Sequence, residues 1–225
     1  MDQDSDPSPS YRSIRALYTP TTITVYQAYN TPIATAALAA HKLVAPFRRT
    51  RMTWIKPSFL WMAYRSGWAT KPNQERILAI EITREGFEWA LAHARLSHPD
   101  NATDREEWEK KKAECPVRVQ WDPERDFAFR PLGYRSLQVG LGGEAVDRFV
   151  DEWTVGIRDV TGLMRELGRL VGEGRMEEAG GLLPVEEEYL LPKGVAGVVG
   201  ADCVRAGEGD GERKEKGEEK RTESS

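Results

Sequence analysis

The sequence predicts a domain of the α/β or α+β class, with a mixed sheet and flanking helices. Segments with β-strand character are interspersed with segments of helical spacing, and no solenoid-length repeat is present. The length of 225 residues suits one ordinary domain. We expect residues 1–10 to be a disordered lead-in, residues 11–192 to form this domain, and residues 193–225 to be mostly a disordered charged tail.

The first third of the chain predicts two strands followed by two helices. The strands are expected at residues 13–18 and 23–29, because the Thr-Pro-Thr-Thr segment between them supplies a turn. Pro32 precedes an Ala-rich helix over residues 33–43. Pro57 opens a second helix over residues 58–65, which the following Ser-Gly pair ends.

The remainder of the chain predicts further strands and helices in mixed order. Residues 76–83 form the clearest strand, and the highly charged stretch 97–115 is expected to be an exposed helix or an insertion. The other expected elements are a helix over 85–96, strands at 117–121 and 136–141 joined by a polar loop, a helix from 144 to 150, a strand at 153–160 and a helix over 163–171.

Several classes of protein and site are excluded. No window approaches the roughly 18 apolar residues of a membrane span, and the N-terminus is acidic, so we expect an intracellular, cytoplasmic protein without membrane contact. Cys115 and Cys203 are too far apart to suggest a thiolate metal site, and His41, His93 and His98 have no second ligand at metal spacing. We therefore predict no metal centre.

Nucleotide-binding and hydrolase motifs are also missing from the sequence. Neither a GxxxxGK[ST] loop nor a GxGxxG segment after a strand is present, which excludes a P-loop or Rossmann site. No GxSxG segment is present either. The sequence therefore contains no complete catalytic signature.

Charge is distributed unevenly along the chain. Residues 7–74 contain nine Lys or Arg residues and no Asp or Glu, whereas residues 75–204 contain 17 cations and 26 anions. Six of the cations fall within twenty-four residues, interleaved with aromatic residues; they are Arg48, Arg49, Arg51, Lys56, Arg65 and Lys71. This block predicts a site for an anionic and aromatic ligand. The alternative is that the acidic second half pairs with these cations.

The basic segment supplies most of the candidate ligand-binding residues. Arg51 can bind a phosphate in bidentate fashion and Lys56 can bind it as a point charge. Ser58 and the free N–H groups at the start of the second helix add donors, and Trp54 can stack on a base. The alternative reading makes the aromatic residues core and leaves the cations in solvent.

The end of the second strand supplies further candidates. Alternation places Tyr26 on one face of this strand and Gln27 and Tyr29 on the other. Polar aromatic residues at a strand end can line a cleft, with Tyr26 as a second candidate for stacking on a base. Packing alone is the alternative explanation.

Candidate acid or base residues follow the strand at residues 117–121. Asp122 and Glu124 are expected in a loop beside Arg125, where a carboxylate can act on a substrate hydroxyl. An ordinary Asp-Pro turn with a local ion pair is the alternative. Arg135 and Gln138, in the next strand, are candidate anion and amide contacts.

The segment RMTWIKPSFLWMAYRSGWATKPNQERILAIEITREGFEWAL, with ITVYQAYN before it and VRVQWDPERD and YRSLQVGL after it, resembles the domain of unknown function 4291 family of bacteria and fungi. The resemblance covers roughly residues 12–161 and implies family membership without a particular activity. The residues at the family's motif positions are Tyr26, Gln27, Tyr29, Arg51, Trp54, Lys56, Ser58, Arg65, Gln120, Asp122, Glu124, Arg125, Arg135 and Gln138.

Three classes of function follow from these observations. The leading hypothesis is an enzyme that binds a nucleotide, or the phosphate-bearing end of a nucleic acid. One version is an ADP-ribosyltransferase-like transferase with NAD as its cofactor, by analogy of fold alone. The alternatives are a non-catalytic RNA- or DNA-binding module and a structural or partner-binding domain.

Overall fold

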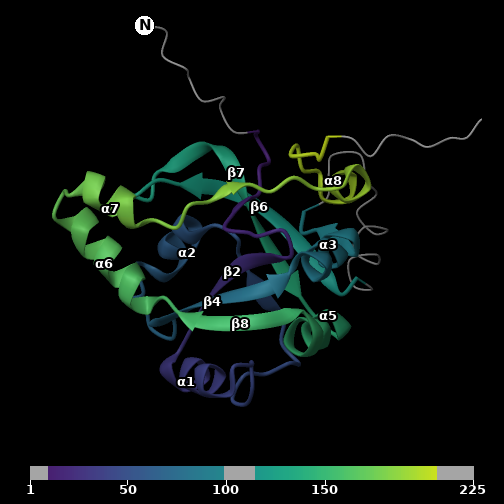
Figure 1. The fold of residues 1–225 in the computed structure, drawn as a ribbon, viewed down its shortest axis with the longest axis horizontal. Helices are drawn as coiled ribbons and strands as arrows, with labels where there is room; N and C mark the ends of the chain where they lie inside the picture. Colours follow the sequence, from purple (N-terminus) through teal and green to yellow (C-terminus); the bar gives the residue numbers. More distant parts are fainter. Residues whose placement is uncertain (1–9, 99–114, 207–225) are drawn as a thin grey trace, which may run out of the picture.

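The computed structural model describes residues 10–98 and 115–206, and it has an α+β fold (Figure 1). Its strands are β1 (Arg15–Ala16), β2 (Thr22–Tyr29), β3 (Thr53–Ile55), β4 (Arg76–Thr83), β5 (Ala94–Leu96), β6 (Val117–Arg125), β7 (Pro131–Leu141), β8 (Thr154–Asp159) and β9 (Glu187–Glu188). They form a three-stranded sheet β2-β4-β8, a four-stranded sheet β3-β7-β6-β5 and a short β1-β9 pair. Strands β5 and β6 are parallel and the other neighbours are antiparallel, which confirms the expected mixed arrangement.

The helices are α1 (Thr31–Ala40), α2 (Phe59–Ser66), α3 (Arg84–Ala92), α5 (Glu144–Arg148), α6 (Thr161–Gly172), α7 (Met176–Leu182) and α8 (Lys193–Val199), and a π-helical turn η1 (Phe149–Trp153) follows α5. Asn30, Ser58 and Thr83 cap the first three helices, each accepting a hydrogen bond from a backbone N–H of the first turn. Gly67 ends α2 in the left-handed conformation, with φ of 58°. In Figure 1, α6 and α7 lie on the left of the central strands and α3 and α8 on the right.

The two larger sheets meet at Tyr26 and Lys56. The backbone N–H of Tyr26 donates to the carbonyl of Lys56 at 2.7 Å, and the N–H of Lys56 donates to the carbonyl of Tyr26 at 3.3 Å. This pair of hydrogen bonds ties the middle of β2 to the residue that follows β3. The carboxyl end of β2 and the segment around β3 therefore lie side by side.

The three-stranded sheet is buried on both faces. One face, with Val25 and Ile80, belongs to a core cluster that also contains Ile55 and Val139 of the four-stranded sheet. The other face, with Tyr26, packs in a second cluster against residues of α2, α6 and α7. Burial on both faces explains why β4 is apolar along most of its length.

The structure corrects several expected element boundaries. Asp122 and Glu124 lie within strand β6 and not in the loop that the sequence predicted. Strand β5 pairs only with residues 117–119 of β6, so one side of Pro123 has no neighbouring strand and its missing N–H costs no ladder bond there. The helix expected over 85–96 ends at Ala92, because the next residues form β5.

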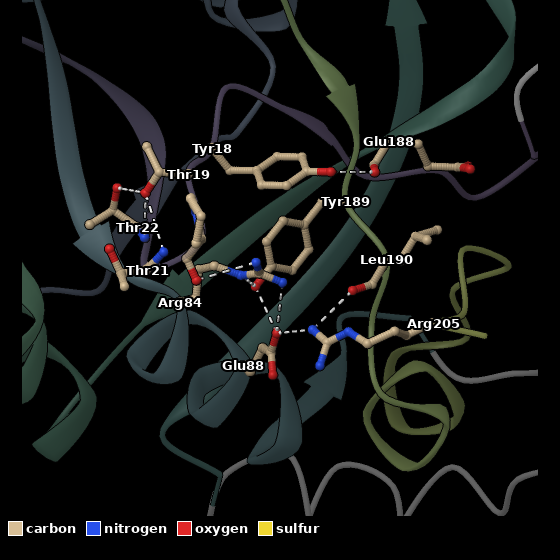
Figure 2. A network of polar contacts seen from close by, with 11 residues as sticks. Tyr18, Thr19, Thr21, Thr22, Arg84, Glu88, Glu188, Tyr189, Leu190 and Arg205 are labelled. Carbon is tan, nitrogen blue, oxygen red and sulfur yellow. Dashed lines mark hydrogen bonds and ion pairs between the residues drawn. The ribbon is translucent and has the colours of Figure 1, made fainter. Parts of the chain in front are cut away.

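The chain after residue 186 is held against α3 by buried polar contacts (Figure 2). The hydroxyl of Tyr189 donates to Glu88 at 2.7 Å and accepts from Arg84 at 2.9 Å. Arg205 donates to the same Glu88 oxygen at 2.8 Å. Because Glu88 and Arg84 lie on α3, these contacts fix both ends of the segment that contains α8.

The expectation of a disordered tail is wrong for residues 193–206. Residues 193–206 are part of the fold, although a tail was predicted from residue 193. Helix α8 buries Ala196 and Val199, the indole N–H of Trp121 donates to the carbonyl of Val199 at 2.8 Å, and Cys203 is buried. Helix α8 was not predicted because its sequence is rich in glycine, which has a low helix propensity. Burial of these side chains supplies the stability of the helix.

Parts of the expected organisation lie outside the described residues. These parts are residues 1–9 of the lead-in, residues 99–114 of the charged stretch, and residues 207–225. Among the helices that the structure describes, none is long and apolar enough to cross a membrane.

Candidate functional site

A cavity of about 940 Å³ opens where the two larger sheets meet. The end of β2, the start of α1, the segment around β3, helix α2, the loop before β4 and strand β7 all contribute to it. Its lining residues are Gln27, Ala28, Tyr29, Asn30, Pro32, Ile33, Pro46, Phe47, Arg48, Arg51, Met52, Thr53, Trp54, Lys56, Met62, Arg65, Pro72, Asn73, Gln74 and Gln138. We call this space the basic cavity.

The basic cavity is lined by four cations and by no carboxylate of the described chain. Arg48, Arg51 and Arg65 are exposed, whereas Lys56 is only 4 % exposed. Within the described residues, none of the four forms an ion pair. Their charges are therefore available to an anion that enters the cavity.

Arg49 differs from its neighbour Arg48. Its guanidinium donates to Asp147 at 3.0 Å and to Asp151 at 2.5 Å and 2.9 Å, on the far side from the cavity lining. Lys42 also pairs with Asp151, at 2.6 Å. The alternative prediction was that cations of the basic first part pair with acidic residues of the second half. It holds for Lys42 and Arg49, whereas the cations of the basic cavity form no ion pair with a described residue.

Lys56 is a nearly buried lining residue of the cavity, in an unfavourable setting for an ammonium group. Its Nζ lies over the ring of Trp61, 4.8 Å from the ring centroid. Burial, and to a smaller extent the charge of Arg65, lowers the pKa of Lys56 to about 7, and Asp122 partly opposes this shift. An anion in the cavity would raise this pKa and favour the charged amine.

A closed hydrogen-bond network forms the wall of the cavity along β2 and β3. The amide nitrogen of Gln27 donates to the hydroxyl of Thr53 at 2.6 Å and to the carbonyl of Trp54 at 3.1 Å. The hydroxyl of Tyr29 donates to the amide oxygen of Gln27 at 2.6 Å, and burial raises the pKa of Tyr29. Gln27 and Tyr29 thus line the cavity, but these polar groups are already hydrogen-bonded within its wall. The two residues therefore hold the wall segments of β2 and β3 in position.

Asp122 is held by two amides of the four-stranded sheet. Gln120 donates to one of its oxygens at 2.8 Å and Gln138 donates to the other at 2.5 Å. Gln138 also lines the basic cavity, and Asp122 is close enough to Lys56 to raise its pKa. These two hydrogen bonds therefore fix a carboxylate next to the lining residue Gln138 and close to Lys56.

Other polar contacts orient the cavity rim. Arg65 donates to the side-chain oxygen of Gln74 at 2.8 Å. Lys71 donates to the carbonyls of Tyr64 and Arg65, at 3.3 Å and 3.0 Å, and so caps the end of α2. Gln74 thereby orients the guanidinium of Arg65. Lys71 hydrogen-bonds to the end of α2 and is not among the lining residues of the cavity.

A second, smaller cavity of about 320 Å³ lies on the other side of the Lys56–Ser58 segment. It is lined by Ser58 and Glu124 together with Arg15 and Glu186. Burial raises the pKa of Glu124, whose carboxylate accepts hydrogen bonds from the backbone of Arg125 and from serine hydroxyls that include Ser58. Burial also raises the pKa of Glu186 to about 8, and its oxygen accepts from the N–H of Phe59 at 2.7 Å.

The structure brings together six of the residues that the sequence singled out. The six that line the basic cavity are Gln27, Tyr29, Arg51, Trp54, Lys56 and Gln138. Tyr26 lies in the core, 1 % exposed and in edge contact with Phe59, so its ring has no free face for a base. Ser58 and Glu124 lie at the second cavity. Arg135 binds the hydroxyl of Tyr11 and the carbonyl of Trp121, both at 2.8 Å, outside either cavity.

Sequence reasoning named Arg48 and Arg65 as members of the basic block without a role of their own, and it did not name Glu186. Arg48 and Arg65 belong to the acid-free block, so the charge pattern contained the signal without separating them from Arg49. Glu186 sits in a run of three glutamates, and no local pattern distinguishes it from its two neighbours.

A comparison with protein families identifies the family of this chain. A family model, the domain of unknown function (DUF4291), matches residues 13–189. No curated protein matches the chain. All residues that line the two cavities fall within the matched range. The match covers most of the chain and extends beyond the motif residues, and the protein therefore belongs to the DUF4291 family.

Proposed function

We propose that the basic cavity binds a nucleotide, or the phosphate-bearing end of a nucleic acid, as the substrate or cofactor of a transferase. The observation that carries the proposal is the set of four unpaired cations around a cavity whose described lining contains no carboxylate. Arginine forms bidentate hydrogen bonds to phosphate, and several such contacts in one cavity favour an anion with more than one negative charge.

The size and the remaining lining suit a ligand with an aromatic part. A volume of about 940 Å³ lies at the upper end of the range for small-molecule sites, which is roughly 300–1,000 Å³. Trp54 and Phe47 offer aromatic surface, while Asn30 and Asn73 offer amide groups for base or sugar edges. NAD, ATP and GTP all fit this description.

Lys56 supports a catalytic role in addition to binding. A group with a pKa of about 7 can accept and donate protons at neutral pH, which an ordinary lysine cannot do. Asp122, held by its two amides, supplies a fixed carboxylate close to this amine. These two residues are our candidates for proton transfer, and Glu124 at the second cavity is left outside this role.

The second candidate function is a non-catalytic RNA- or DNA-binding module. It is favoured by the exposure of Arg48, Arg51 and Arg65, which a nucleic-acid backbone can reach from solvent. Such a module contacts many phosphates along an open groove, whereas a nucleotide site contacts a few in a cavity. The salt dependence of binding separates a nucleic-acid-binding module from a nucleotide site.

A thermal-shift screen tests the proposal. The purified protein is heated with NAD, ATP, GTP, cyclic nucleotides, inorganic pyrophosphate or short RNA, at low and moderate salt. A ligand at about 100 times its dissociation constant stabilises by about 2.7 kcal/mol, which is easily measured. We expect a stabilising ligand whose effect is lost in Arg51→Gln.

Arg49→Gln is the matched control for this screen. It removes a cation two residues from Arg51 that is already bound to Asp147 and Asp151 and does not line the cavity. The stabilisation by ligand should persist in this variant. Equal loss in both variants, or no stabilising ligand at all, would contradict the proposal.

A further inference from the structure

The amine of Lys56 differs from those of the other described lysines. Lys42 is bound by Asp151, Lys71 donates to two carbonyls, and Lys193 is exposed. Lys56 makes neither a hydrogen bond nor an ion pair through Nζ with any described residue, and its contact is the ring of Trp61. Its nitrogen thus has no described acceptor that would hold its protons, in a residue that lines the basic cavity.

An amine in this setting is a nucleophile at neutral pH. With a pKa of about 7, a large part of Lys56 is neutral in ordinary buffers, whereas about one in a thousand ordinary lysines with a pKa near 10.4 is neutral at pH 7.4. Enzymes that form imines use a lysine made neutral by burial or by a neighbouring cation. Lys56 has both, because it is buried and lies close to Arg65.

We propose that Lys56 forms an imine with the carbonyl group of a phosphate-bearing aldehyde or ketone bound in the basic cavity. This inference rests on the proposed function, since the same cations would hold the phosphate. It narrows the ligand to compounds that also contain a free carbonyl group, such as the open-chain form of a sugar phosphate. Arg48, Arg51 and Arg65 surround the cavity from which such a carbonyl would approach Nζ.

The reaction needs no oxidant, reductant or metal. The lone pair of Nζ attacks the carbonyl carbon, a carbon–nitrogen bond forms, and the carbonyl oxygen takes a proton that the nitrogen releases. The hydroxyl group of the resulting carbinolamine takes up a proton from solvent and leaves as water, while the nitrogen keeps its second proton, so that a protonated imine forms. The protonated imine carries a positive charge close to Asp122, whose carboxylate favours the charged form of this nitrogen.

Reductive trapping tests this proposal on the full chain. The protein is incubated with pyridoxal 5′-phosphate, an aldehyde that carries a phosphate, and the imine is reduced with cyanoborohydride before peptide mass mapping. We expect the adduct on Lys56 to form faster than on Lys42, Lys71 or Lys193. With pyridoxal, which lacks the phosphate, the rate of labelling at Lys56 relative to Lys193 should fall at least about tenfold, because the phosphate contacts are missing.

The pH profile provides a second readout that does not depend on any variant. The rate of labelling at Lys56 should level off above about pH 7, whereas labelling of an exposed lysine should keep rising toward pH ~10. Inorganic pyrophosphate should slow the labelling of Lys56 and leave Lys193 unchanged. Lys56→Arg should lose only the adduct at this position.

The outcomes separate this inference from the proposed function. Labelling of Lys56 at the rate of Lys193, or the same ratio of Lys56 to Lys193 labelling with pyridoxal and with its phosphate, overturns the imine proposal. If pyrophosphate stabilises the wild type and Arg49→Gln but not Arg51→Gln, while Lys56 is not trapped, the imine proposal falls and the proposed function stands. If pyrophosphate has no effect on stability or labelling, both fall.

Discussion

Tyr26 and Lys56 exchange backbone hydrogen bonds of 2.7 Å and 3.3 Å, and their side chains serve opposite purposes. The Tyr26 ring fills the core beside Phe59, whereas Lys56 is a lining residue of the basic cavity. The backbone of Lys56 is tied to a buried strand, which fixes the point from which its side chain extends. The fold therefore holds an amine where its charged form is costly to keep, unless an anion binds there.

Lys56→Met should change how stability depends on pH. The pKa of Lys56 falls from the ordinary 10.5 to about 7 on folding, so between these values the unfolded chain binds a proton that the folded protein lacks. The free energy of unfolding of the wild type therefore rises with pH across this window, and below pH 7 the folded protein bears the full cost of the buried charge. We expect Lys56→Met to be more stable at pH 6, by on the order of 2–4 kcal/mol, with the difference shrinking toward pH 10.

Urea denaturation at pH 6, 8 and 10 measures this difference. Lys42→Met is the control, because Lys42 lies at the surface in an ion pair with Asp151. A destabilised Lys56→Met protein, or an advantage that does not vary with pH, would show that Lys56 stabilises the fold as a cation.

The stability advantage of Glu186→Gln over the wild type should grow as pH rises, opposite to that of Lys56→Met. The pKa of Glu186 rises on folding from 4.5 to about 8, because of burial and the nearby Glu124, so the folded protein binds a proton that the unfolded chain lacks between these values. The free energy of unfolding of the wild type therefore falls as pH rises from 4.5 through 8. Glutamine keeps an acceptor for the N–H of Phe59 and cannot ionise.

We therefore expect Glu186→Gln to match the wild type near pH 5 and to be more stable near pH 9, by on the order of 1–3 kcal/mol. Thermal or urea unfolding at the two pH values measures this. Glu187→Gln, at the exposed neighbouring position, should show no such trend. A Glu186→Gln protein that is less stable near pH 9 would mean that the carboxylate itself stabilises the start of α2.

Gly140→Ala should disturb the cavity wall. A Cβ at Gly140 would lie 2.9 Å from the sulfur of Met52 and 2.9 Å from the Trp54 ring, and both side chains line the basic cavity. Overpacking of this kind costs about 1–3 kcal/mol, and displacement of Trp54 should also weaken ligand binding. Gly133→Ala, in the same strand with nothing within 4 Å of its Cβ, is the control for both measurements. Equal behaviour of the two variants would mean that the wall adapts freely.

Salt dependence should distinguish a nucleotide site from a nucleic-acid groove. With a few phosphate contacts in one cavity, the logarithm of nucleotide affinity should fall with a shallow slope against the logarithm of salt concentration. A binder of single-stranded nucleic acid falls with a slope of about 0.7 for each phosphate contacted, so a long RNA gives a steep one. Fluorescence titrations over a salt series measure both, and a steep slope with RNA combined with no nucleotide binding would favour the non-catalytic module.

Local signals were sufficient for some elements of this fold. Strand β4 has the predicted bounds of residues 76–83, and helix α2 (Phe59–Ser66) is displaced by one residue from the predicted 58–65. The three residues of β3 and the Gly-rich α8 were not predicted. Their stability comes from pairing with β7 and from burial against α3, which depend on distant parts of the chain.

The site could be predicted in part for the same reason. The acid-free block identified Arg51 and Lys56 as candidates. What separates Arg48 from Arg49 is the presence of Asp147 and Asp151 about a hundred residues later, and no local pattern contains that information. Alternation correctly placed Tyr26 and Gln27 on different faces of β2, but because both faces of the sheet are buried, it could not show that the Tyr26 face is core.

The most direct test of an anion site at the basic cavity is a ¹H–¹⁵N spectrum recorded during titration with inorganic pyrophosphate, following the tryptophan indole N–H signals. Trp54 lines the cavity, whereas the indole of Trp121 is buried and donates to the carbonyl of Val199. We expect the Trp54 signal, assigned from its loss in Trp54→Phe, to shift until it saturates while the Trp121 signal stays in place. A Trp54 signal that does not move at saturating pyrophosphate, or that moves no more than that of Trp121, would contradict the account.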